Sequence, residues 1–262
     1  MYNFGAPDTE TGGVLSRLVP AAGGSFYLLS SSGYGVLERV QAPAPPGGLW
    51  TAGTLYIFPF LSTPDSLTAG PNGVFYVTMS NTPGGLGSVV QLTPPAAPGG
   101  RWTETLLYRF QSGGDDAGNP NSLTLAGDGT LYGTTYGFDL DGDIGRGTVF
   151  QLTPPPSPGG HWSYTALRDF EDFHPDVPLI LRNGNLYGAF ESNYGSAYGG
   201  AVFELQPPST PGGKWTLTYL HQFTGGQSPF GNLVMDEAGT IFGTTISTAE
   251  PYTGTVFAIT TK

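Results

Sequence analysis

The sequence has 262 residues, including 42 Gly and 24 Pro, and a formal net charge of −11. Its nine Lys and Arg residues form no basic cluster, which argues against binding to nucleic acid or to an anionic membrane. Cys is absent, which excludes disulfides, thiolate metal sites and Cys nucleophiles. The 16 Phe and 14 Tyr residues, with regularly spaced Val, Ile and Thr, indicate many short strands joined by turns rather than disorder.

The first residues, Met1 to Asp8, contain no basic segment followed by an apolar run, so we expect no signal peptide within them. No apolar run in the chain approaches the roughly 18 residues of a membrane span, and we expect no membrane insertion.

Five copies of one β-rich unit then follow each other along the chain. Each copy opens with a short apolar run containing a leucine, followed by a tight turn, a second strand and a third strand. The third copy shows the pattern well, with the turn GDGT and the strands LYGTT and TVFQL. Asn-Gly and Asp-Gly turns suit tight hairpins because they accept positive φ. The five leucines are Leu18, Leu67, Leu123, Leu179 and Leu233.

A fourth strand begins at a tryptophan in four of the copies. Each tryptophan follows a Pro-rich segment ending in Gly-Gly, and a phenylalanine comes about eight residues later. We name the strands a to d, from the leucine strand to the tryptophan strand. Four strands repeated at spacings of 52, 60 and 53 residues, without helical periodicity, predict propeller blades. The recurring pairs are Trp50 and Phe58, Trp102 and Phe110, Trp162 and Phe170, and Trp215 and Phe223.

We therefore predict an all-β, five-bladed β-propeller of four-stranded antiparallel blades, forming a single domain over residues 1–262. The fifth copy lacks a tryptophan strand, and Met1-Tyr-Asn-Phe4 resembles the end of one. Residues 1–4 are therefore expected to complete the last blade, which would remove two open sheet edges. We expect the propeller to be a monomer. The predicted blades are approximately 13–58, 65–110, 121–170, 177–223 and 231–262 plus 1–4.

The third to fifth copies resemble the Gloeobacter/Verrucomicrobia (GloVer) tandem repeat of bacterial and some fungal proteins. The first two copies diverge, with Leu28 and Val77 where later copies have glycine. The resemblance implies secretion or surface display, but no particular activity. It is carried by residues Gly129–Thr135 with Gly147–Leu152, Gly184–Gly188 with Gly199–Leu205, and Gly239–Thr245 with Gly254–Phe257.

A ligand site is expected on the face formed by the d–a and b–c loops, which vary in length and carry most of the acidic and aromatic residues. The residues just before the a-strand leucines should surround the mouth of the central channel. They are polar and differ between blades, which favours either a ligand or hydrogen bonds to strand ends. These residues are Arg17, Asp65, Ser66, Asn121, Ser122, Asp176 and Asn232.

Arg17 could clamp a carboxylate or sugar hydroxyls, or it could pair with Asp65 or Asp176. Aromatic residues on the same loops could stack on sugar rings, although some must pack between blades. The tryptophans recur in every complete repeat and are interpreted as packing residues. The loop aromatics are Tyr34, Phe60, Tyr136, Phe138, Tyr194, Tyr198, Phe230 and Tyr252.

Two further loops carry candidate chemistry. Asp139, Asp141 and Asp143 alternate as in the first half of a calcium loop, but the following Gly and distal Glu of an EF-hand are missing. A solvated acidic loop is the alternative, and no other cofactor is expected. His174 lies among carboxylates and could act as a base, but no nucleophile motif accompanies it.

Three functions remain open from the sequence. The first is an extracytoplasmic, lectin-like propeller that binds a carbohydrate or another small polar ligand. The second is a glycoside hydrolase or lyase in which Asp65 and Asp176 act as acid and base or nucleophile, which requires carboxyls roughly 5–9.5 Å apart. The third is a structural or adhesive protein without a ligand.

Overall fold

The computed structural model describes the chain outside its first 15 residues, its last residue and several loops. The described residues are 16–31, 34–43, 47–60, 62–82, 86–111, 118–137, 147–157, 159–170, 173–175, 177–192, 199–210, 212–224, 227–247 and 253–261. The fold is the predicted all-β, five-bladed propeller, with mostly four-stranded antiparallel blades. The chain divides into two compact units, residues 1–110 and residues 111–262, which are described separately.

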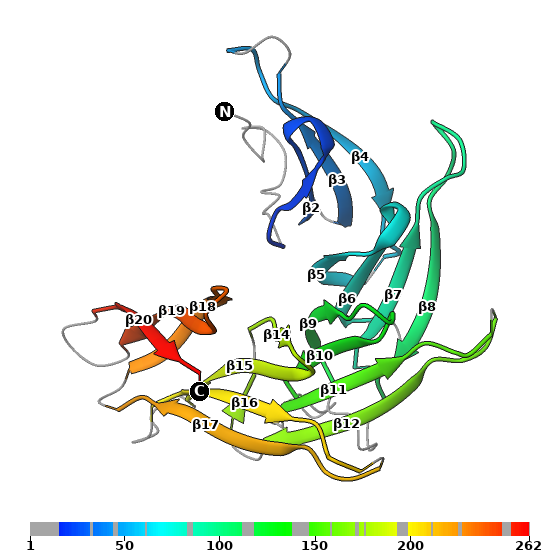
Figure 1. Ribbon diagram of the computed structural model, residues 1–262. Helices are drawn as coiled ribbons and strands as arrows, with labels where there is room; N and C mark the ends of the chain where they lie inside the picture. The colour runs from blue at the N-terminus through cyan, green and yellow to red at the C-terminus, as the bar shows by residue number, and fades with distance from the viewer. Residues whose placement is uncertain are drawn as a thin grey trace. The chain divides into compact units, whose positions relative to one another are not determined.

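The first unit contains two four-stranded sheets, each ordered as in the sequence (Figure 1). The turns between strands a and b are short 3₁₀ segments, η1 (Ala22–Gly24) and η2 (Pro71–Gly73). The strands are β1 (Val19–Ala21), β2 (Ser25–Ser31), β3 (Gly35–Gln41) and β4 (Thr51–Ile57), then β5 (Thr63–Ala69), β6 (Phe75–Asn81), β7 (Ser88–Thr93) and β8 (Thr103–Arg109).

The second unit contains three sheets. The first is ordered β9-β10-β11-β12, the second β13-β15-β16-β17 with β14 also on β15, and the third β18-β19-β20. The strands are β9 (Pro120–Leu125), β10 (Leu131–Thr135), β11 (Gly147–Thr153), β12 (Ser163–Phe170), β13 (Phe173–His174), β14 (Ile180–Arg182), β15 (Asn185–Ser192), β16 (Ala201–Gln206), β17 (Thr216–Gln222), β18 (Gln227–Met235), β19 (Thr240–Ser247) and β20 (Thr255–Thr260).

The fourth blade differs from the predicted pattern because its inner strand is split. β13 and β14 both pair with β15, at Ser192 and Glu191 for β13 and at Asn185 to Tyr187 for β14. Pro175 and Pro178 lie between the two pieces, and proline has no N–H with which to continue a ladder. The split places His174 on a strand, whereas the sequence predicted a loop.

The last sheet has three strands in the described residues, so β20 forms its edge (Figure 1). Residues 1–4, which are predicted to complete this blade, lie outside the described residues. The closure of the ring by the N-terminal segment therefore stays a prediction.

The cores lie between consecutive sheets of each unit. In the first unit, Leu29 and Leu37 pack with Leu67, Val77 and other buried residues of the second blade. The second unit has two such cores. Four of the five repeat leucines are buried, but Leu18 is 52% exposed because it precedes the three-residue strand β1.

The tryptophans pack as predicted. Trp50 lies 6.1 Å from the Phe26 ring, and Trp102 stacks on Phe75 at 5.9 Å between ring centroids. Trp215 meets Tyr132 edge-on at 6.2 Å.

Candidate functional site

In the first unit, two exposed aromatic side chains contact each other on the loops that the sequence singled out. The rings of Tyr34 and Phe60 lie 5.8 Å apart, and the side chains are 51% and 66% exposed. Large exposed aromatics are costly to leave in water, so a contacting pair on loops indicates a binding surface. We call Tyr34 and Phe60 the aromatic pair.

The backbone beside the aromatic pair is closely packed. The amide of Phe58 donates to the carbonyl of Gly35 at 2.9 Å. Gly35 also lies against Pro64, where an added Cβ would come within 2.3 Å of the proline Cδ. The residue next to Tyr34 and the start of β5 are thus held together.

Asp65 lies on a β-bulge, because the register of β5 against β6 shifts between Pro64 and Ser66. Bulges redirect side chains and are frequent beside functional sites. Burial raises the pKa of Asp65 above its ordinary value of 3.8, although hydrogen bonds from the hydroxyl and backbone N–H of Ser80 lower it. Its Oδ2 atom is buried and has no hydrogen-bond partner in the described part of the chain.

Arg17 precedes β1 and its side chain is exposed. Among the described residues no ion pair joins it to Asp65, and its other predicted partner, Asp176, lies outside them. Its neighbour Ser16 is engaged locally, since the Ser16 hydroxyl accepts the amide of Leu29 at 2.9 Å. Arg17 is therefore available to a ligand, but no described contact directs it toward one.

Both serines of the predicted ring bond within their own blades, and Ser122 Oγ also donates to the Val177 carbonyl of the fourth blade at 3.5 Å. Ser66 Oγ lies 2.9 Å from Thr78 Oγ1, and Ser122 Oγ lies 2.9 Å from Thr134 Oγ1. Both threonines are fully buried. These hydroxyls therefore tie strand a to strand b, which corresponds to the structural alternative for this position.

In the second unit, two predicted residues come together on the loop face. The rings of Tyr136 and His174 stack at 4.4 Å with an angle of 12°, and His174 Nδ1 donates to the Tyr136 carbonyl at 2.6 Å. The other ring nitrogen, Nε2, is buried and has no described hydrogen-bond partner. Glu191 pairs with His174 across β13 and β15, and burial raises the pKa of this carboxyl.

The remaining residues that the sequence predicted for the site contribute less to it. Asn121 is partly buried in β9, and Asn232 is exposed in β18 where the register with β19 shifts. Asp176, Tyr194 and the calcium candidates Asp139, Asp141 and Asp143 lie outside the described residues. Within the residues that are described, no group of three His, Asp or Glu side chains is placed to hold a metal ion. Nor do they contain a helix long and apolar enough to cross a bilayer.

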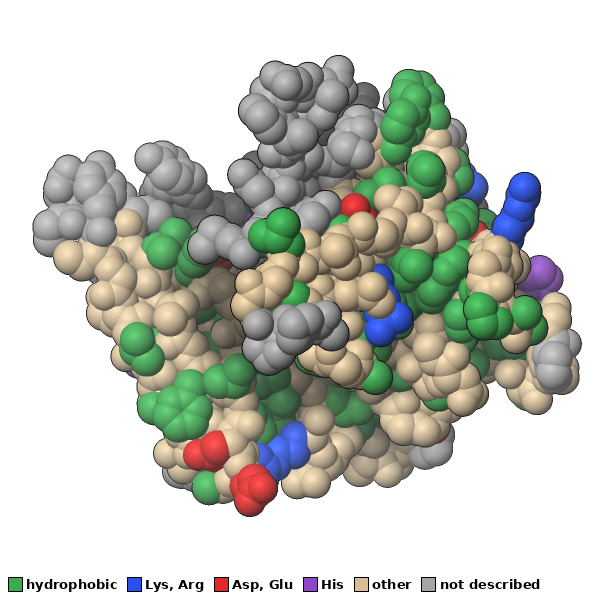
Figure 2. Space-filling model, turned by 90° about the horizontal axis from the view of Figure 1, so that it is seen from above, with side chains coloured by type: hydrophobic (Ala, Val, Ile, Leu, Met, Phe, Trp, Pro, Cys, Tyr) green, Lys and Arg blue, Asp and Glu red, His purple; other side chains and the backbone are tan. Residues whose placement is uncertain are grey.

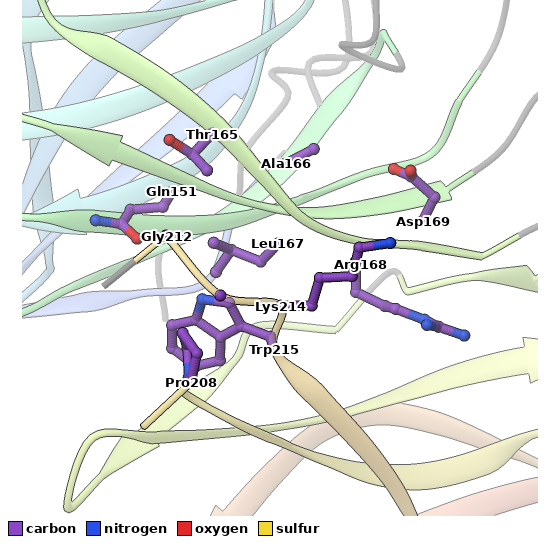
Figure 3. A pocket seen from close by; sticks show the side chains of 11 residues that line it. Gln151, Thr165, Ala166, Leu167, Arg168, Asp169, Pro208, Gly212, Lys214 and Trp215 are labelled. Carbon is purple, nitrogen blue, oxygen red and sulfur yellow. The ribbon is translucent and has the colours of Figure 1, made fainter. Parts of the chain in front are cut away.

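The sequence did not indicate that Ser80 and Glu191 lie beside the candidate site residues, or that there are cavities between blades. One cavity of about 530 Å³ lies along β12 and the start of β17. Figure 3 shows Gln151, Leu167 and Trp215 around it, while the Arg168 side chain extends away from Trp215. A Tyr in the b strand and a Trp in the d strand recur from blade to blade. This recurrence was the available sequence signal for the cavities between blades.

Comparison with known proteins agrees with the fold. Residues 62–262 match the sequence model of the Gloeobacter/Verrucomicrobia repeat. No curated protein matches the chain. Among solved structures, a putative oxidoreductase (glucose dehydrogenase) of Thermus thermophilus aligns at 18% identity and TM-score 0.52, covering 90% of this chain and 78% of that one.

A second solved structure, the polysaccharide lyase Uly1, aligns at 11% identity and TM-score 0.51. The alignment covers 93% of this chain and 57% of the lyase. An endo-arabinanase of Bacillus licheniformis aligns at 14% identity and TM-score 0.47, over 93% of this chain and 91% of that one. At these identities the likeness concerns the fold alone.

Proposed function

The chain belongs to the Gloeobacter/Verrucomicrobia repeat family, and we propose that it is a lectin-like propeller that binds a carbohydrate or another small polar ligand. The exposed contact between Tyr34 and Phe60 carries this proposal. Flat aromatic rings can stack on the apolar face of a sugar while nearby polar groups bind its hydroxyls. The exposed Arg17 is the residue of this unit proposed to supply such a polar group.

The surface also favours an uncharged ligand. On the face drawn in Figure 2, charged side chains are sparse among hydrophobic and uncharged atoms. Charged residues make up only 11% of the chain. The net charge of −11 also disfavours an anionic ligand, so recognition would depend on stacking and hydrogen bonds.

Binding is favoured over hydrolysis by the carboxylates of the first unit. Glycoside hydrolysis uses two carboxyl groups. The other described carboxylates of this unit, Glu38 and Glu104, already accept hydrogen bonds from Ser30 and Tyr56. Asp65 alone could supply a proton but has no described carboxylate partner for a second role. The fold shared with the polysaccharide lyase Uly1 leaves a lyase as the alternative.

A glycan array followed by calorimetric titration tests the proposal. We expect a saccharide to bind with an affinity that falls at least about tenfold in Tyr34→Ala and in Phe60→Ala. Arg17→Ala should weaken the same ligand if Arg17 reaches it. Leu49→Ala, which changes an exposed residue before the tryptophan of the first blade, is the matched control. Retained affinity in both aromatic variants would reject this site.

Two finer features of the architecture are also proposed. Residues 1–4 are proposed to pair with the open edge of β20 and so complete the last blade. An extracytoplasmic location is proposed from the family resemblance, and fractionation of the source cells would test it.

A further inference from the structure

A tryptophan at the start of an outer strand can pack against the preceding blade, as Trp215 does. Trp215 lies at the start of the outer strand of the fourth blade, and its ring contacts Tyr132 on the b strand of the third. Both rings border the core between these blades, together with Leu217. Trp102 stacks on Phe75 of its own blade and borders the core that also contains Leu29 and Leu37 of the first blade. Trp102 and Trp215 thus each border a core that the preceding blade shares.

The equivalent place between the fourth and fifth blades is a cavity of about 680 Å³. Tyr187, which corresponds to Tyr132 in the repeat, lines it directly. In the cavity between the third and fourth blades, Trp215 forms part of the lining and Tyr132 does not (Figure 3). We call the larger cavity the socket; Tyr187 and Glu204 line it from the fourth blade, and Ala238, Gly239, Ile259, Thr260 and Thr261 from the fifth.

The socket adjoins an open strand edge. In the fourth blade, Leu205 and Gln206 pair with Leu217 and Thr216, directly after Trp215. Their counterparts in the fifth blade are Ile259 and Thr260, at the end of β20. This end has no partner strand in the described part of the chain. A strand added to β20 in the same register would therefore bring its tryptophan to the socket.

The polar lining suits an indole ring. Glu204 Oε1 accepts hydrogen bonds from the Tyr187 hydroxyl at 2.8 Å and from Asn185 Nδ2 at 2.7 Å. These bonds fix the carboxylate, and its other oxygen has no hydrogen bond to a described residue. The indole N–H is a donor without acceptor capacity, which matches a fixed carboxylate oxygen.

We propose that the socket binds the tryptophan of a further repeat of this family, presented as an extended Gly-Gly-x-Trp strand that adds to β20. Strand addition supplies the main-chain hydrogen bonds, and the socket supplies specificity. Residues 1–4 correspond to Leu220–Phe223, the far end of an outer strand, so the proposed closure of the ring leaves the socket open. The interaction is independent of the carbohydrate site.

The test is a titration of the full chain with a peptide that copies residues 212–223 and carries 5-fluorotryptophan, followed by ¹⁹F NMR. We expect saturable binding and a shifted fluorine signal. Replacing the peptide tryptophan with alanine should weaken binding at least about tenfold, as is usual for buried aromatic anchors. Ala238→Trp, which fills the socket from an exposed turn, should weaken it equally. Glu204→Gln should weaken it without removing the fold.

Tyr132→Phe and His174→Gln are the matched controls. Tyr132 lies where Trp215 already packs, and His174 lies on the loop face. Both should bind the peptide as the parent chain does. Failure to saturate at millimolar peptide would overturn the proposal, as would binding that ignores both the peptide tryptophan and Ala238→Trp. Displacement of the peptide by a saccharide would also overturn it, since the socket would then be a glycan subsite.

Discussion

Single glycines explain the sequence signature of the later blades. Gly133 lies opposite Phe150 across β10 and β11, and an added Cβ would come within 2.3 Å of the Phe150 ring and 2.7 Å of the Ser122 carbonyl. The pairs Gly188–Phe203 and Gly243–Phe257 repeat this arrangement. Blade two has Val77 opposite Val90. The glycine therefore makes room for a phenylalanine, and both change together.

Gly133→Ala should destabilise the protein because neither the Phe150 ring nor the Ser122 backbone can withdraw from a closely packed core. We expect a loss of about 3 kcal/mol in the free energy of unfolding, at the upper end of what overpacking costs. Gly127→Ala is the matched control, since nothing lies within 4 Å of its added Cβ. Urea unfolding measures both, and equal stabilities of the two variants would contradict this explanation.

Asp65 should make stability depend on pH in a definite direction. Its folded-state pKa is raised above 3.8, so the folded chain holds the proton more tightly than the unfolded chain. The stability from this group is complete below pH 3.8 and is lost as pH rises through the raised folded value. Asp65→Asn should remove this group's part of the decline, leaving the parts of Glu104 and Glu191, whose pKa values burial also raises, and should leave the protein at least as stable at neutral pH.

Thermal unfolding scans across this pH range measure the change, and Asp128→Asn provides a control of opposite sign in the same scans. The backbone N–H of Thr130 lowers the pKa of Asp128, so its contribution is present above pH 3.8 and is lost as pH falls through the lowered folded value. If Asp65→Asn kept the parent's decline of stability with rising pH, another group would have to cause it.

At the scale of strands, the repeat predicted which segments pair but not how each pairing is interrupted. Strand order and the packing of Trp102 and Trp215 follow from periodicity and recurring residues. The bulge at Asp65 depends on hydrogen bonds to β6 that the sequence does not display. The split of the fourth inner strand had a signal in Pro175 and Pro178, which interrupt a ladder.

The candidate site was predictable only as a set of loops. Tyr34, Phe60 and Asp65 were all recognised, but the contact between Gly35 and Pro64, which joins the residue after Tyr34 to β5, was not. Ser66 and Ser122 looked like ligand groups because their positions vary between blades. Their partners Thr78 and Thr134 occupy one repeat position, so the joint occurrence of Ser and Thr was the available signal for an internal bond.

For the whole molecule, the fifth sheet has three strands among the described residues, and β20 is an open edge. Val256 is 80% exposed, whereas Val89, Val149 and Val202 at the same repeat position are fully buried. In a propeller each four-stranded blade is covered by its neighbours. The sheet β18-β19-β20 alone is therefore an incomplete blade, and the proposed pairing of residues 1–4 would supply part of what it lacks.

Phe4 should be the residue through which this closure stabilises the molecule. In the complete blades, Phe58, Phe110 and Phe223 are buried, and their amides donate to Gly35, Gly87 and Gly200 at 2.9–3.0 Å. The repeat predicts that Phe4 lies against Gly254 in the same way. Phe4→Ala should then cost about 3–5 kcal/mol of unfolding free energy in urea, as for other buried phenylalanines. Phe60→Ala, at a residue 66% exposed, should cost far less. A Phe4→Ala variant as stable as the parent would mean that the last blade is not completed by the N-terminal segment.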